Sequence, residues 1–164
     1  GSQQTAPIAV TEPDAVAAGT PRLFSDAQRV ALRKLSATLV PPFSGYPSAL
    51  EAGVPEFLEF LVSAAAGDVQ SLWRQGLDSL NARSTQQYGK PFAEAGPSET
   101  AALLEPLRQP WTYDAPPAPY AACLREAKDA MLRATRHSRE WAEAARSRSR
   151  RAASAESPYW LPVE

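Results

Sequence analysis

The sequence contains very few of the residues that build metal, haem or nucleophilic centres. Among its 164 residues it has one cysteine, Cys123, and one histidine, His137. A single cysteine cannot form an internal disulfide, and one cysteine with one histidine cannot supply the four ligands of a structural zinc site. The C-x-x-C-H motif of haem attachment is absent, and none of the eight glycines falls into a G-x-G-x-x-G or phosphate-loop pattern. No catalytic, cofactor-binding or metal-binding residue can therefore be assigned from a motif.

Long apolar runs and strand-like alternation are also missing. No apolar stretch approaches the ~20 residues that a transmembrane helix needs, and no segment of useful length alternates apolar and polar residues. The formal net charge is -1, so no overall field attracts the chain to nucleic acid or to an anionic membrane. With 44% apolar residues, the chain has the composition of one globular domain. We expect an all-α fold.

The first helix is predicted at about residues 25–40. Ser25 and Gln28 have the spacing of a capping box at its start, and the Pro41-Pro42 pair cannot continue a helix. Residues 1–22 are rich in small side chains and are expected to form a flexible tail, opening on a Gly-Ser pair that resembles the scar of a cleaved expression tag. The expected single domain covers residues 23–164.

Apolar periodicity predicts the remaining helices of a domain with about five helices. They are expected at residues 54–66, 68–88 and 97–107, with a last one that begins at residue 120, is about 30 residues long, and has room for a kink near His137. A Pro-rich surface loop at residues 109–119 precedes this long C-terminal helix. Gly76 falls on an apolar face, where close approach of another helix is one explanation for a glycine.

Three apolar stripes are expected to face the core. They are Val30, Ala31, Leu35 and Leu39 in the first helix, Val54, Phe57, Leu58, Leu61, Val62 and Ala65 in the second, and Val69, Leu72, Trp73, Leu77 and Leu80 in the third.

Few side chains are candidates for catalysis. His137 is the only imidazole and hence the only general-base candidate near neutral pH, but a packed or solvated histidine beside arginines fits its neighbours better. Cys123 lies on an apolar stripe, where a free thiol behaves as a small hydrophobe. Glu56 and Glu59 are three residues apart on one helix, which is typical of a solvated face.

Positive charge is concentrated near the end of the chain. Residues 120–151 contain nine Lys or Arg against four Asp or Glu, a local net of +5 that leaves -6 for the remainder. A nucleic-acid site would have stacking aromatics between the cations and a basic chain overall, and neither is present beyond Trp141. A solvated or partner-facing arginine patch is the favoured interpretation, because arginine is enriched at protein interfaces.

Several segments together resemble the gluconate 2-dehydrogenase subunit 3 family. A helix that ends in V-P-P is followed by a Gly/Pro loop and by A-L-E-A-G-V-P-E-F-L-E-F-L, over residues 49–61. Three later features are similar: the Leu72-Trp73 helix that runs to Leu80-Asn81, the Y-G-K-P-F turn at residues 88–92 before the Leu103-Leu104 helix, and the S-R-E-W segment at residues 138–141. The resemblance covers about residues 23–164.

The resemblance implies a non-catalytic small subunit of a membrane-associated dehydrogenase that oxidises a sugar or polyol. The large subunit of such a complex is a flavoprotein of the glucose-methanol-choline (GMC) type that holds FAD and the catalytic histidines, and a cytochrome c subunit often accepts the electrons. Family members commonly have a twin-arginine export signal, which implies a periplasmic location and a role in stabilising and exporting the flavoprotein; this sequence has no such signal. Contact with a membrane would be indirect, through the complex.

Two other hypotheses stay open beside this one. The chain could be an independent helical module for a different protein partner, or an enzyme centred on His137. For a partner subunit, the C-terminal third is the predicted interface, because it combines aromatics with arginines; the competing view is that Trp141 and Trp160 close the core of the monomer. The predicted interface residues are Trp111, Tyr113, Arg133, Arg136, Arg139, Trp141, Arg146, Tyr159 and Trp160.

Overall fold

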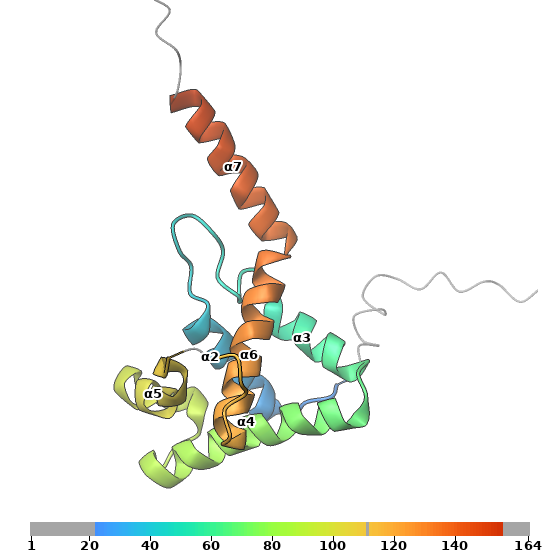
Figure 1. The fold of residues 1–164 in the computed structure, drawn as a ribbon, viewed down its shortest axis with the longest axis vertical. Coiled ribbons are helices and arrows are strands. Elements are labelled where there is room, and N and C mark those ends of the chain that lie inside the picture. The colour runs from blue at the N-terminus through green and yellow to red at the C-terminus, as the bar shows by residue number, and fades with distance from the viewer. Residues whose placement is uncertain (1–21, 111, 156–164) are drawn as a thin grey trace, which may run out of the picture.

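The computed structural model describes residues 22–110 and 112–155, and this part of the chain is all-α, with six α-helices, two short 3-10 helices and no strand. Figure 1 shows their arrangement. The predicted tail, except Arg22, lies outside the described residues, as does the aromatic C-terminal end. In chain order the elements are α2 (Asp26–Leu39), α3 (Val54–Ser63), α4 (Gly67–Tyr88), η1 (Phe92–Glu94), α5 (Pro97–Leu103), η2 (Glu105–Arg108), α6 (Pro119–Arg136) and α7 (Arg139–Ala155).

The predicted boundaries of α2 are confirmed. The Ser25 amide donates to Gln28 Oε1 at 2.9 Å and the Gln28 amide donates to Ser25 Oγ at 3.2 Å, which is the predicted capping box. The helix ends at Leu39, directly before Val40 and the two prolines. Asp68 could cap a helix by residue type but does not cap α4, because α4 begins at Gly67 and the Asp68 carboxylate accepts from the amide of Val69.

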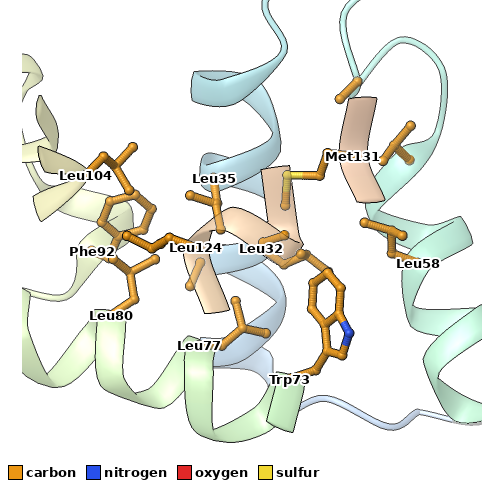
Figure 2. Close-up of a cluster of buried hydrophobic side chains, with 14 of the residues drawn as sticks. Leu32, Leu35, Leu58, Trp73, Leu77, Leu80, Phe92, Leu104, Leu124 and Met131 are labelled. Atoms are coloured by element: carbon orange, nitrogen blue, oxygen red, sulfur yellow. The ribbon is translucent and has the colours of Figure 1, made fainter. Parts of the chain in front are cut away.

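Helix α6 lies across α2, α3 and α4 and completes the core (Figure 1). Figure 2 shows apolar side chains of α2, α3, α4 and α6 packed together, with Phe92 and Leu104 at one side and Leu58 at the other. The largest fully buried apolar side chains are Phe92, Leu32, Leu80, Met131 and Val54. None of the helices in the described residues is both long and apolar enough to span a bilayer.

Close packing at Gly76 confirms the explanation suggested for this glycine. A Cβ built on Gly76 would overlap the sulfur of Cys123 in α6 and would lie 3.5 Å from the Cys123 Cβ. The backbone of α4 therefore approaches α6 to a distance that leaves no room for a side chain at this crossing.

Several apolar residues expected in the core are exposed, and that part of the prediction is wrong. Val30 in α2 is 50% exposed, Phe57 and Leu61 in α3 are 47% and 46% exposed, and Val69 and Leu72 in α4 are 38% and 48% exposed. In each of these helices, the face that contacts the core is narrower than the apolar stripe in the sequence. Apolar residues at the edge of the stripe are therefore exposed. In α3 that face is Val54, Leu58 and Val62, which are 1%, 3% and 5% exposed.

The long C-terminal helix is two helices, which corrects the prediction of one continuous element. After α6 ends at Arg136, the Ser138 hydroxyl donates to the Thr135 carbonyl at 2.7 Å and accepts from the Trp141 amide at 3.1 Å. Ser138 is thus a side-chain cap that starts α7, and the break falls at the predicted kink. Helix α7 has no buried residue and projects from the body of the molecule (Figure 1).

Candidate functional site

A tight turn at residues 43–46, called the hairpin turn below, lies at the tip of the loop between α2 and α3. The Phe43 amide donates to the Tyr46 carbonyl at 3.3 Å, and the Tyr46 amide donates to the Phe43 carbonyl at 2.9 Å. Ser44 and Gly45 both have positive φ, 51° and 81°, as a two-residue hairpin connection of this kind requires. The turn leaves Phe43 78% exposed.

Three contacts hold α7 against the hairpin turn. The rings of Tyr46 and Trp141 stack with centroids 4.1 Å apart and planes at 23°. Arg148 donates from Nη1 to the carbonyl and hydroxyl oxygens of Ser44, the latter at 2.9 Å. Its guanidinium carbon also lies 5.3 Å from the centre of the Tyr46 ring. Two segments about 100 residues apart in sequence therefore form one surface.

An apolar hollow of about 270 Å³ lies beside this contact, at the junction of α6 and α7. Phe43 and Trp141 contribute aromatic surface to it, and Arg136 contributes a cation. Its full lining is Leu39, Val40, Pro41, Phe43, Leu132, Thr135, Arg136 and Trp141. Apolar surface beside an arginine has the composition of protein interface centres.

A second apolar hollow, of about 280 Å³, lies between α3 and α6. It includes the two exposed α3 side chains Phe57 and Leu61, and Arg133 and His137 line it beside them. Its lining is Phe57, Leu58, Leu61, Ala130, Arg133, Ala134 and His137. Two hollows that both reach the α6–α7 junction thus combine exposed apolar side chains with arginine, which favours protein binding.

A larger depression of about 520 Å³ lies between α2, α5 and η2, away from the junction. The one lysine on it, Lys34, donates to the backbone carbonyls of Ala93 and Ala95 and lies 5.4 Å from the ring centre of Phe92. This ammonium group therefore stabilises the fold around η1, and the depression has no arrangement of acid and base.

The predicted interface residues are distributed over different parts of the molecule. Arg133, Arg136 and Trp141 meet around the α6–α7 junction, and Arg139 and Arg146 lie exposed on α7. Tyr113, 93% exposed, lies in the loop before α6, where the backbone carbonyls of its two neighbours accept from Arg125, eleven residues before Arg136. Trp111, Tyr159 and Trp160 lie outside the described residues.

Sequence reasoning missed Phe43, Phe57 and Leu61 as surface residues. For Phe43 a signal was present, because Phe43 and Tyr46 flank a Ser-Gly pair of the type that favours a hairpin turn. For Phe57 and Leu61 the helical periodicity predicted burial, and only the tertiary arrangement places them outside.

The catalytic candidates lack the neighbours that acid–base or nucleophilic chemistry requires. The exposed His137 imidazole has no hydrogen-bond partner within residues 22–110 and 112–155, and burial, with a smaller effect of Glu126, raises the pKa of the Cys123 thiol. Glu59 is structural: it accepts from Arg29 Nε and Nη2 and from the Phe24 amide at 2.9–3.0 Å. No cluster of three His, Cys, Asp or Glu suitable for a metal occurs in the same residues.

Comparison with known protein families places most of the described helices within one family model. The family model described as gluconate 2-dehydrogenase subunit 3 matches residues 26–151, which includes every helix from α2 to most of α7. Neither a curated protein nor a solved structure matched the chain.

Proposed function

The chain belongs to the gluconate 2-dehydrogenase subunit 3 family, and from that premise we propose that it is a non-catalytic small subunit that binds the large subunit of an FAD-dependent dehydrogenase. The family name is that of a subunit, which makes membership of a multi-subunit dehydrogenase the natural context for the chain. The large subunit in this proposal is a GMC-type flavoprotein that oxidises a sugar or polyol.

The observation that supports binding is the group of exposed apolar side chains beside arginines at the α6–α7 junction. Phe43 and Trp141 line one hollow with Arg136, and Phe57 lines the other with Arg133. Burial of apolar surface drives association, and arginine beside aromatics is typical of the residues that contribute most to affinity.

In the proposed complex the flavoprotein supplies the FAD and the catalytic groups, and this chain supplies a docking surface. A cytochrome c subunit takes up the electrons, and the assembled complex contacts the membrane indirectly. The small subunit stabilises the flavoprotein and accompanies it through twin-arginine export to the periplasm. The proposals about electron transfer, stabilisation and export are drawn from membership of the family.

Co-purification tests the proposal directly. The chain, with an affinity tag, is co-expressed with the dehydrogenase large subunit of the same organism, and we expect a yellow complex with one FAD per large subunit. Recovery of the chain without the flavoprotein, while the flavoprotein folds and binds FAD on its own, contradicts the proposal. Capture of a different protein instead favours the hypothesis of an independent binding module.

A further inference from the structure

A polar hollow of about 600 Å³ lies between the hairpin turn and the middle of α7, beside the contact of Arg148 with Ser44. One of its cations, Arg148, is fixed in place by its bonds to Ser44 and by the Tyr46 ring. A second cation, Arg151, lies one helical turn further on. The lining is Ser44, Gly45, Ala144, Ser147, Arg148 and Arg151.

The Arg148 guanidinium has one edge engaged and one edge open. Nη1 donates to the two oxygen atoms of Ser44. Nε and Nη2 have no hydrogen-bond acceptor within the described residues. These two nitrogens form the edge with which arginine binds a carboxylate through two parallel hydrogen bonds. The hairpin turn thus orients the side chain and leaves its carboxylate-binding edge available.

No acidic side chain of the described residues neutralises this part of α7. Arg146, Arg148, Arg150 and Arg151 fall within six residues, and residues 144–155 contain no Asp or Glu. The acidic residues of α7, Glu140 and Glu143, lie 3.7 Å from Arg139 at the other end of the helix. No ion pair reaches the four later arginines in residues 22–110 and 112–155.

We propose that this hollow binds an acidic segment of the dehydrogenase large subunit, with one carboxylate of that segment on the Nε and Nη2 edge of Arg148 and a second near Arg151. The inference rests on the proposed function, because the partner is the large subunit. Charge complementarity of this kind orients the two proteins as they meet and raises their association rate. The apolar hollows supply further affinity.

A polyanion such as nucleic acid or an anionic membrane fits these features less well. Residues 146–151 contain no aromatic residue on which bases could stack, and the nearby Tyr46 ring is already engaged by Trp141. The chain as a whole has a net charge of -1, so no overall field attracts it to an extended anionic surface.

The test uses the double variant R148E/R151E, which lowers the net charge by four, and a control, R74E, which lowers it by two at an exposed position on α4. Binding to the purified flavoprotein large subunit is measured at low and at high salt. We expect R148E/R151E to raise the Kd at least about tenfold at low salt, with the difference shrinking at high salt, and R74E to change it less than about twofold. Circular dichroism of each variant verifies that it is folded.

A second variant separates geometry from charge. R148K keeps the positive charge but cannot form two parallel hydrogen bonds to a carboxylate, and we expect it to weaken binding severalfold. The inference is overturned if R148E/R151E binds the large subunit as tightly as R74E does, or if R148K binds like the parent.

The remaining outcomes distinguish this inference from the proposed function. If the double variant binds the large subunit normally but loses binding to phosphatidylglycerol vesicles or to duplex DNA, the hollow serves a different anion and the inference is wrong while the proposed function stands. If the parent chain does not bind the large subunit at all, the proposed function fails and this inference fails with it.

Discussion

Gly76 illustrates at the residue scale how closely α4 and α6 pack. Because a Cβ here overlaps the Cys123 sulfur, a large side chain must push the two helices apart. We expect Gly76→Leu to destabilise the fold by about 2 kcal/mol or more, which lowers the Tm by about 4–8 °C in a domain of this size. Gln75→Leu, at the exposed neighbouring position, is the control and should leave the Tm nearly unchanged. Equal melting of the two variants would show that the crossing can open at little cost.

The ion pair of Glu59 with Arg29 predicts a dependence of stability on pH. Burial alone would raise the pKa of Glu59, but the hydrogen bonds from Arg29 and from the Phe24 amide outweigh it and hold the pKa below its ordinary value. A lowered folded-state pKa stabilises the fold above the unfolded-state value of about 4.3, and this contribution is lost as the pH falls through the folded-state pKa.

We therefore expect Glu59→Gln to lower the Tm at pH 7 by about 2–4 °C, the shift produced by about 1 kcal/mol. The difference from the parent should shrink as the pH falls below about 4. Glu56→Gln removes an exposed ion pair with Arg33 and should change the Tm much less. A gap between parent and Glu59→Gln that stays constant down to pH 2 would contradict the assignment.

At the scale of the elements, the start of α7 depends on one side chain. Ser138→Ala removes the acceptor of the Trp141 amide, which costs about 1 kcal/mol at a helix N-cap. Since α7 has no buried residue, the loss should appear as faster hydrogen exchange in the first turns of α7, with little change in the global Tm. Ser149→Ala, on the exposed surface of the same helix, should not alter the exchange.

The exposed face of α3 provides a test of partner binding that is independent of charge. Replacing Phe57 and Leu61 together by serine removes apolar surface from the hollow between α3 and α6, and we expect capture of the dehydrogenase large subunit to fall about tenfold or more. The equally exposed Val30→Ser on α2 is the control. Both variants should melt close to the parent, and unchanged capture by the α3 variant would exclude this hollow from the interface.

Several helix ends were predictable from the sequence, although the helix expected at residues 97–107 ends at Leu103 and is followed by the 3-10 helix η2. The division of apolar residues between core and surface was not predictable. Ser25, Pro41 and Gly89 mark boundaries by local backbone chemistry, and the structure has helix ends at each. The apolar pattern of α3 covers more of the helix than the core can contact, so periodicity could not separate Leu58 from Phe57. Ser138 also looked like an ordinary helical residue, because serine caps a helix only when the backbone around it turns.

The candidate site was also predictable only in part, because some of its features follow from local sequence and others from tertiary contacts. The number and position of the arginines follow from the sequence, and so did the expectation that Arg133, Arg136 and Trp141 belong to one region. The stacking of Trp141 on Tyr46 joins residues that are 95 positions apart, and no local pattern encodes such a contact. The hairpin turn therefore entered the site only through the tertiary structure.

For the whole molecule, the prediction about the C-terminal end remains to be tested. Deleting residues 157–164 removes Tyr159 and Trp160, and we expect co-purification of the large subunit to weaken about tenfold, equal to 1.4 kcal/mol. The helical circular dichroism and the Tm of the isolated chain should hardly change. Unfolding of the shortened chain would assign the tail to the core of the monomer, and undiminished capture would exclude it from the interface.

The length of α7 sets the distance between the α6–α7 junction and the last residue of the helix, Ala155. Its 17 residues at 1.5 Å each place Ala155 about 25 Å from the α6–α7 junction. While α7 stays helical, it acts as a spacer of fixed length. Any molecule that contacts both the α6–α7 junction and Ala155 must therefore offer two contact points about 25 Å apart.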